Sequence, residues 1–232
     1  MGVPLQVRCT HNGKYNVFFV ADDEYIGRAI ANGYEWDGWM RADIQKFYED
    51  GTDILDIGAN IGYNSLMFSD YGPVHAFEPL FHKVVRLNVE NNDLKCPIHI
   101  FPYALSDREQ TVDMYYPKAV EASGLRNYGG SSMYKQEWSD ESSKTEVKCH
   151  RLDDVYHGVP SVIKIDVEGH EMEVLKGAES TIKKYMPTIL IELFDFDKNE
   201  AAKYLKSLGY DDPEIRPEHV YLYRAKDIFS TM

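Results

Sequence analysis

Three ionisable side chains stand close together in the stretch IDVEGHE, residues 165–171. Asp166, Glu168 and His170 directly follow a run of β-branched residues that is typical of a buried strand. Carboxylates can accept a proton or bind Mg²⁺ or Mn²⁺, and a histidine with an unperturbed pKa of about 6.5 suits a base at neutral pH. We predict that these three residues are catalytic. The alternative for His170 is that it starts a helix and bonds only to backbone.

Two more charged residues accompany this group. Glu192 ends the next predicted strand and could complete a site for Mg²⁺ or Mn²⁺ with Asp166 and Glu168. The alternative for Glu192 is a structural acid held in a salt bridge. Lys164 lies inside the strand that precedes Asp166. It either pairs with Asp56 or Glu192, or occupies a half-exposed position at an edge.

A turn rich in small residues, DIGANIG at 56–62, separates a strand-like run from a helix-like pattern. Glycine permits a sharp turn and lets a ligand approach bare backbone, and the helix that follows offers unpaired N–H groups. The dinucleotide fingerprint G-x-G-x-x-G is absent, because Asn60 occupies the position of its second glycine. We predict a cofactor site formed by Asp56, Gly58, Asn60 and Gly62.

An acid at the end of the following strand narrows the choice of cofactor. Glu78 comes after the apolar residues 74–77, where a carboxylate can accept hydrogen bonds from both hydroxyls of a ribose. No arginine stands beside it to hold a pyrophosphate. An uncharged nucleoside that carries a small zwitterion fits better, and S-adenosyl-L-methionine meets this description.

Strand-like and helix-like segments alternate along most of the chain. We expect strands at residues 53–57, 74–77, 98–101, 162–166, 188–193 and 219–224. Helices are expected at about 171–185 and at 199–208. This alternation predicts a parallel α/β sheet with helices on both faces, whose ligands bind at the carboxyl ends of the strands. The acids expected at those ends are Asp56, Glu78, Asp107, Asp166 and Glu192.

One region lacks this alternation. Residues 115–146 are polar and aromatic without clear periodicity, which is typical of a functional loop or of disorder. Residues 111–116 and 146–152 could flank this insert as an added strand pair. We expect residues 1–50 to form an N-terminal layer or lid and residues 51–232 the catalytic domain, in one compact domain overall.

Several residues outside these stretches are candidates for binding the acceptor. Arg126 and Tyr128 lie in the insert, and the stretch GGSSM at 129–133 could cover the site as a lid. Trp36 and Trp39 could stack on the faces of a sugar, but packing within the N-terminal layer is the favoured interpretation.

Composition excludes some classes of protein. The formal net charge of −13 argues against a protein that binds nucleic acid through its phosphates. The three cysteines show no zinc-site spacing and predict reduced thiols in a cytoplasmic compartment. No apolar run approaches the length of about 20 residues that crosses a membrane.

The sequence resembles the FkbM-type family of S-adenosylmethionine-dependent O-methyltransferases. The resemblance spans most of the chain in the correct order, in the stretches GYE (33–35), DIGANIGYNSL (56–66), AFEP (76–79), ALSD (104–107), GGSSM (129–133), LDD (152–154) and IKIDVEGHEMEVLKGA (163–178). It implies a Rossmann-like class I methyltransferase sandwich with a mostly parallel seven-stranded sheet, an N-terminal extension and an inserted loop or strand pair.

The same resemblance assigns roles to the cofactor-binding residues. Gly58, Asn60 and Gly62 would line the methionine end of S-adenosyl-L-methionine, and Glu78 would hold its ribose. Ser106 and Asp107 would lie beside the adenine.

The resemblance to this family implies that the acceptor is a hydroxyl of a sugar or glycan. The alternatives are a hydroxyl of a natural product or lipid-linked alcohol, and a non-catalytic domain that only binds the cofactor. Retention of the whole IDVEGHE stretch argues against the last, because a binding domain needs no acids beside the methyl group. The chain could also be a domain excised from a longer, glycosyltransferase-linked protein.

Overall fold

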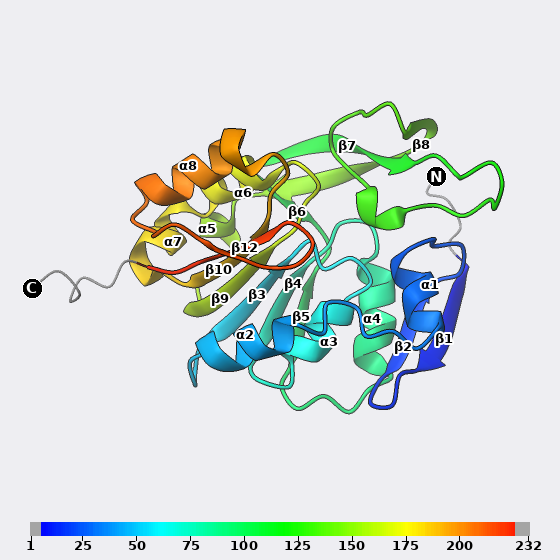
Figure 1. Ribbon diagram of the computed structural model, residues 1–232, viewed down its shortest axis with the longest axis horizontal. Coiled ribbons are helices and arrows are strands. Elements are labelled where there is room, and N and C mark those ends of the chain that lie inside the picture. The colour runs from blue at the N-terminus through cyan, green and yellow to red at the C-terminus, as the bar shows by residue number, and fades with distance from the viewer. Residues whose placement is uncertain (1–5, 226–232) are drawn as a thin grey trace, which may run out of the picture.

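The structure is a computed structural model that describes residues 6–225, apart from the side chains of residues 141 and 142. A seven-stranded sheet forms its centre (Figure 1), in the spatial order β11-β12-β10-β9-β3-β4-β5. Neighbouring strands from β10 to β5 are parallel, whereas β12 pairs antiparallel with β10 and β11. This arrangement confirms the predicted mostly parallel seven-stranded sheet. Its strands are β3 (Asp53–Ile57), β4 (Val74–Phe77), β5 (Ile98–Phe101), β9 (Pro160–Ile165), β10 (Thr188–Glu192), β11 (Glu214–Ile215) and β12 (Val220–Tyr223).

The central strands are apolar on both faces because helices cover both. Successive side chains of a strand point to opposite faces. In β3, Ile54 accordingly packs in one hydrophobic core, and Leu55 and Ile57 pack in the other. The first core is covered by α2 (Met40–Phe47), α3 (Tyr63–Phe68) and α4 (His82–Glu90). The second is covered by α5 (Leu152–Val155), α6 (Glu171–Gly177), α7 (Glu179–Tyr185) and α8 (Glu200–Ser207).

The six predicted strands are all present, with boundaries that differ by at most two residues. The single helix expected at 171–185 is wrong, because the chain forms α6 and α7 with a break at Ala178. Gly177 packs so closely on the backbone of Ser106 that an added Cβ would lie 1.9 Å from its carbonyl oxygen. The carboxylate of Asp153 accepts hydrogen bonds from the N–H groups of Ser180 and Thr181, both at 2.9 Å, and so caps the new helix.

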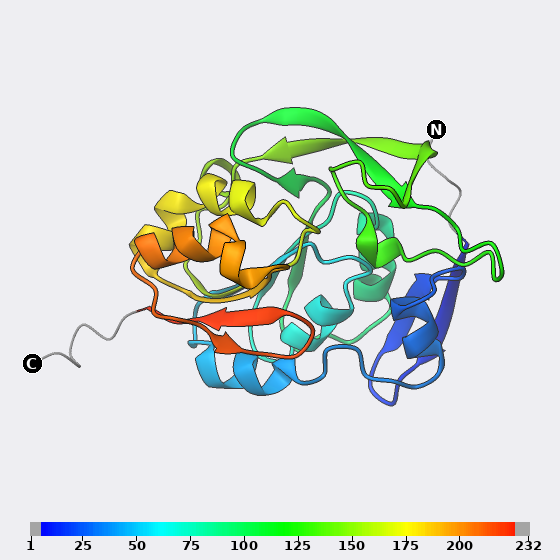
Figure 2. The ribbon, with the colours of Figure 1, turned by 45° about the horizontal axis from the view of Figure 1, so that its top comes forward.

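A second sheet carries the insert. β7 (Gln110–Pro117) pairs antiparallel with β8 (Ser139–His150), and β6 (Ala104–Leu105) adds to the other side of β8. The predicted strand pair flanking the insert is therefore present, although both strands are longer than expected. Figure 2 shows this sheet crossing above the central strands. Between β7 and β8 lie the loop of the insert and a short 3-10 helix, Tyr128–Gly130.

The N-terminal segment forms a hairpin of β1 (Val7–His11) and β2 (Asn16–Val20), followed by α1 (Ile26–Ala31). Residues 1–5 of the predicted N-terminal layer lie outside the described part of the chain. The hairpin packs beside α4, where Asn88 donates a hydrogen bond to the carbonyl of Phe18 and accepts one from its N–H. Packing of both Trp36 and Trp39 on the first core agrees with the packing interpretation of these tryptophans.

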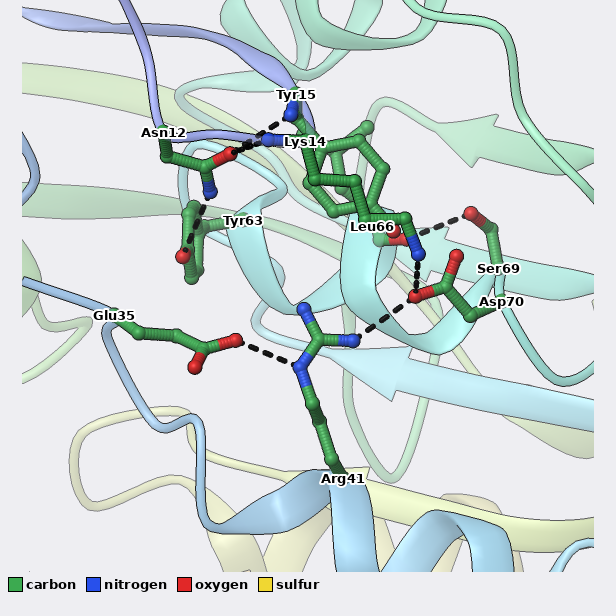
Figure 3. Close-up of polar contacts among 9 residues, drawn as sticks. All are labelled: Asn12, Lys14, Tyr15, Glu35, Arg41, Tyr63, Leu66, Ser69 and Asp70. Carbon is green, nitrogen blue, oxygen red and sulfur yellow. Dashed lines mark hydrogen bonds and ion pairs between the residues drawn. The ribbon is translucent and has the colours of Figure 1, made fainter.

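A polar network fixes this segment to α2 and α3 (Figure 3). Arg41, on α2, donates to Glu35 at 2.7 Å and to Asp70 at 2.9 Å, and Lys14 of the hairpin loop also pairs with Asp70. In the same loop, Asn12 donates to the hydroxyl of Tyr63 at 3.1 Å. Arg41 thereby joins Glu35, in the segment before α2, to Asp70, which follows α3.

We expect Arg41→Ala to lower the free energy of unfolding by about 1–3 kcal/mol, because two charge-assisted hydrogen bonds are lost and Asp70 loses a partner. Urea unfolding followed by circular dichroism measures this loss. The matched control is Lys203→Ala, whose pair with Glu200 is exposed on both sides and should change stability by less than about 0.5 kcal/mol. Equal losses in the two variants would contradict a structural role for Arg41.

Candidate active site

A cavity of about 390 Å³ opens at the carboxyl ends of the central strands. It lies at the switch point of the sheet, because the chain runs from β3 outward to β5 and then returns to β9 on the other side of β3. Its volume falls within the range of about 300–1,000 Å³ that is usual for ligand pockets. Gly58, Asn60, Glu78, Asp166, Glu168 and Glu192 all line it. The strand order therefore brings together acids that lie up to 114 residues apart in sequence.

The loops that follow β3 and β9 touch at this switch point. Gly58 has a φ of +79°, and an added Cβ would lie 1.8 Å from the carbonyl oxygen of Asp166. The N–H of Asp166 donates to the carbonyl of Ile57 at 3.1 Å. Glycine is required at position 58 both for its backbone conformation and for this close approach.

Glu78 organises the turn after β3. Its Oε2 accepts a hydrogen bond from the N–H of Asn60 at 2.8 Å, and its Oε1 accepts from the N–H groups of Leu80 and Phe81 at 2.7 and 2.9 Å. Burial raises the pKa of Glu78 to about 7, although these three hydrogen bonds oppose the shift. A carboxylate offers about four acceptor positions, so one remains for a ligand hydroxyl.

A buried lysine lies under the floor of the cavity. Lys164, on β9, is 4% exposed and donates to the carbonyl of Gly58 at 2.8 Å. Its ammonium also lies 3.3 Å from Asp166 and 3.6 Å from Asp56. Burial alone would lower the pKa of Lys164, but the two carboxylates raise it above its ordinary value. The pairing with Asp56 is therefore confirmed, and an edge position for Lys164 is wrong.

Asp56 lies below the cavity rather than in its wall. It is fully buried, and its Oδ2 accepts a hydrogen bond from the hydroxyl of Ser65 on α3. Burial raises the pKa of Asp56, and Lys164 opposes this shift. Asp56 thus joins the start of α3 to the lysine on the neighbouring strand.

Three carboxyl groups converge on the opposite side of the cavity from Glu78. Asp166, Glu168 and Glu192 each place an oxygen within 4.8 Å of the other two. Burial and then Asp166 raise the pKa of Glu168 to about 8 and that of Glu192 to about 10. Glu168 and Glu192 therefore favour their protonated forms near neutral pH, and a cation placed beside them would favour their ionised forms. Hard oxygen ligands of this kind suit Mg²⁺ or Mn²⁺.

Two further acids line the cavity that the sequence did not indicate. Asp37 precedes α2, and Glu218 precedes β12. Burial and then Asp37 raise the pKa of Glu218 to about 7, so the two carboxyls lie close together. Both have a positive φ, of 49° and 58°, as does Glu168 at 53°. Such backbone conformations are rare for residues other than glycine and concentrate at functional sites, but no sequence pattern marked these two positions.

The insert forms part of the cavity wall. Tyr128, Gly129, Gly130, Ser131 and Met133 line the cavity, as the predicted lid requires. Arg126, in contrast, pairs with Asp140 and donates to the carbonyl of Pro117. Ser132 donates to the carbonyl of Glu168 at 2.8 Å, which ties the insert directly to the acidic loop.

His170 lies beside the cavity but not in its lining. It is 5% exposed, and both ring nitrogens have hydroxyl partners: Nδ1 lies 3.1 Å from Tyr134 and Nε2 lies 3.0 Å from Ser106. Burial lowers the pKa of His170, which favours the neutral ring. This arrangement connects the insert to the loop after β6, and a role as base for a ligand in the cavity stays a prediction.

Three residues that are predicted to bind the cofactor also lie next to the cavity lining rather than in it. Gly62 begins α3 with a φ of +81° and packs against Val85 of α4. Ser106 and Asp107 follow Leu105, which does line the cavity. Their predicted contacts with the cofactor stay predictions.

The Methyltransferase FkbM domain profile matches residues 56–212, which is more than half of the chain. The chain belongs to the FkbM methyltransferase family. The chain is similar to the hexuronic acid methyltransferase AglP of Haloferax volcanii, with 33% identity over 72% of this chain and 66% of AglP. It is also similar to the methyltransferase sdnD of Sordaria araneosa, with 28% identity over 71% of this chain and 76% of sdnD. The chain thus spans just under two thirds of AglP.

Among solved structures, the FkbM methyltransferase of Methylobacillus flagellatus KT has a TM-score of 0.48 and 17% identity. The match covers 78% of this chain and 47% of that one. Within residues 6–225, no helix is both long and apolar enough to cross a bilayer.

We expect Gly58→Ala to lower the free energy of unfolding by about 2–5 kcal/mol. The left-handed backbone accounts for about 1–2 kcal/mol and the clash with Asp166 for about 1–3 kcal/mol. Gly51→Ala is the matched control, because Gly51 has a φ of +82° with no atom near an added Cβ, and only the backbone cost applies. Urea unfolding measures the free energy of unfolding of both variants. Equal losses of stability would show that the contact between the loops after β3 and β9 does not stabilise the protein.

Proposed function

We propose that the chain is an S-adenosylmethionine-dependent O-methyltransferase that acts on a hydroxyl of a sugar or glycan. The observation that supports this proposal best is the row of groups along the carboxyl edge of the sheet. Glu78 follows β4, the Gly58 turn follows β3, and the three carboxyls follow β9 and β10. The cofactor would lie along this row, with its ribose at Glu78 and its methyl group toward Asp166.

The charges of the cavity suit such a cofactor. The sulfonium of S-adenosyl-L-methionine is a cation. Burial and the neighbouring Asp166 raise the pKa values of Glu168 and Glu192, so a cation beside these two carboxyls would favour their ionised forms. A hydroxyl of the ribose would occupy the fourth acceptor position of Glu78, beside the hydrogen bond from Asn60.

The reaction needs an acceptor oxygen in line with the methyl group and a group that takes the hydroxyl proton. The oxygen forms a bond to the methyl carbon while the carbon–sulfur bond breaks, and the electron pair of that bond stays on the sulfur. Asp166 is the proposed proton acceptor, with Glu168 and Glu192 beside it to share the proton. Where a divalent ion is bound, these three carboxylates would hold it, and the ion would lower the pKa of a bound hydroxyl.

A sugar acceptor is supported by the similarity to AglP, a hexuronic acid methyltransferase. Residues 1–50 are proposed as an N-terminal layer that closes the site of a catalytic domain at 51–232, since Trp36 and Asp37 line the cavity. A cytoplasmic location and the exclusion of nucleic acid as a substrate stay predictions.

We expect Asp166→Asn to lower methyl transfer at least about 100-fold, because the proton acceptor is lost, while S-adenosylhomocysteine affinity changes only a few fold. Transfer of labelled methyl groups to saccharide acceptors measures the first effect. Calorimetric titration with S-adenosylhomocysteine, with and without Mn²⁺, measures the second and tests for a metal. A Mn²⁺ heat that Asp166→Asn abolishes would place the ion at this carboxylate.

The matched control is Asp197→Asn, since Asp197 is exposed and does not line the cavity. This variant should keep both activity and affinity. Binding of NADH in place of S-adenosylhomocysteine, or wild-type turnover by Asp166→Asn, would contradict the proposed function.

We expect the affinity for S-adenosylhomocysteine to increase as the pH rises through about 7. The ribose hydroxyl binds the ionised form of Glu78, whose pKa is about 7 in the free protein, so binding releases a proton below that pH. Without cofactor, stability should fall as the pH rises from about 4.5 to 7, because the carboxyl ionises first in the unfolded chain.

Calorimetry in two buffers of different ionisation enthalpy measures the released proton. In Glu78→Gln the pH dependence of both affinity and stability should decrease. An unchanged dependence in this variant would assign the proton to another group.

A further inference from the structure

We propose that the acceptor subsite excludes anionic sugars, so that the methylated sugar carries no carboxylate, sulfate or phosphate within the cavity. This inference rests on the proposed function, because it concerns the acceptor of the same site. It distinguishes the chain from AglP, a hexuronic acid methyltransferase, because a hexuronic acid carries a carboxylate.

The charged lining of the cavity is almost entirely acidic. Among the described residues that line it, one is a cation, Lys164, and none is an arginine or histidine. The acids in the lining are Asp37, Glu78, Asp166, Glu168, Glu192 and Glu218. An anionic acceptor would lose its hydration in this cavity with no described cation to pair with other than Lys164, and burying a charge without a partner is unfavourable.

Lys164 is not available to such an acceptor. Its ammonium is already held by the carbonyl of Gly58 and the carboxylates of Asp56 and Asp166, at 2.8, 3.6 and 3.3 Å. One hydrogen bond and two ion pairs therefore already compensate its charge. It is also 4% exposed, which leaves little of its surface facing the cavity.

Asp37 and Glu218 extend the acidic lining toward the outside. Glu218 is exposed and Asp37 is half-buried, yet both line the cavity and lie close enough to raise the pKa of Glu218. An anion entering past them would meet acidic groups, and no described cation of the lining, before it reached Asp166. Carboxylates are, in contrast, good acceptors for the hydroxyls of a neutral sugar.

The mouth of the cavity also carries exposed aromatic side chains. Tyr25, Trp138 and Phe194 are 53%, 56% and 50% exposed, and all three line the cavity. They come from three separate segments: the residue before α1, the end of the insert and the loop after β10. Aromatic faces bind the apolar C–H faces of a sugar ring without any charge on the ligand. An acidic interior with an aromatic rim therefore fits a neutral saccharide.

The test is a matched set of three methyl glycosides: a neutral hexopyranoside, its C6 carboxylate, and the primary amide of that carboxylate. The amide has nearly the shape of the carboxylate but no charge, so the set separates charge from fit. Sets built on glucose, galactose and mannose are incubated with the wild-type chain and S-adenosyl-L-methionine, with and without Mn²⁺. Mass spectrometry detects the methylated sugar, and kcat/KM is measured for each acceptor.

We expect the hexoside and the amide to have a kcat/KM at least about tenfold higher than the carboxylate, with most of the difference in KM. An equal or higher value for the carboxylate would overturn the inference while the proposed function stands. Turnover of the carboxylate that appears only with Mn²⁺ would also overturn it, because the ion would supply the missing positive charge. Binding of S-adenosylhomocysteine without methylation of any sugar would overturn both.

Charge variants provide the second measurement. In Asp37→Asn with Glu218→Gln, the discrimination against the carboxylate should decrease several fold, while the ratio of hexoside to amide stays the same. Glu109→Gln is the control, since Glu109 is exposed and does not line the cavity. An undiminished discrimination in the double variant would contradict a role for these two acids.

Discussion

The arrangement of the site depends on a lysine buried in the middle of the central sheet. A buried ammonium is costly unless nearby groups compensate it, and Lys164 is compensated by Asp56, Asp166 and one backbone carbonyl. These contacts hold the loop after β3 against the loop after β9. The same lysine offsets only part of the negative charge, so the cavity above it stays acidic and suits a cationic cofactor.

The close contact of these loops is possible because the backbone there adopts rare conformations. Gly58, Asn60 and Glu168 have φ values of +79°, +53° and +53°. Asn60 and Glu168 each carry a cost of about 1–3 kcal/mol, which must be offset elsewhere. For Asn60 the compensation is a hydrogen bond from its N–H to Glu78, and for Glu168 it is a hydrogen bond from Ser132 to its carbonyl. Strain in the site is thus compensated by the elements that enclose it.

The apolar pattern predicted the strands well because each central strand is buried on both faces, and β3, β4 and β5 begin and end where expected. Local pattern could not predict the break between α6 and α7, since its causes are contacts with Ser106 and Asp153, distant in sequence. The acids that follow strands were found from sequence because parallel strands end at one edge. Asp37 and Glu218 reach the cavity from irregular loops, so only the tertiary structure reveals them.

His170 shows how the IDVEGHE stretch serves more than one part of the molecule. Its first two acids line the cavity, whereas the histidine lies beside that lining and joins Tyr134 of the insert to Ser106 beyond β6. A neutral imidazole has one donor and one acceptor, which matches two hydroxyl partners, and its burial favours that neutral form. Ser132 adds a second link between the insert and the same stretch. The loop that holds the acids therefore also sets the position of the wall that closes over them, so movement of the insert would displace Glu168.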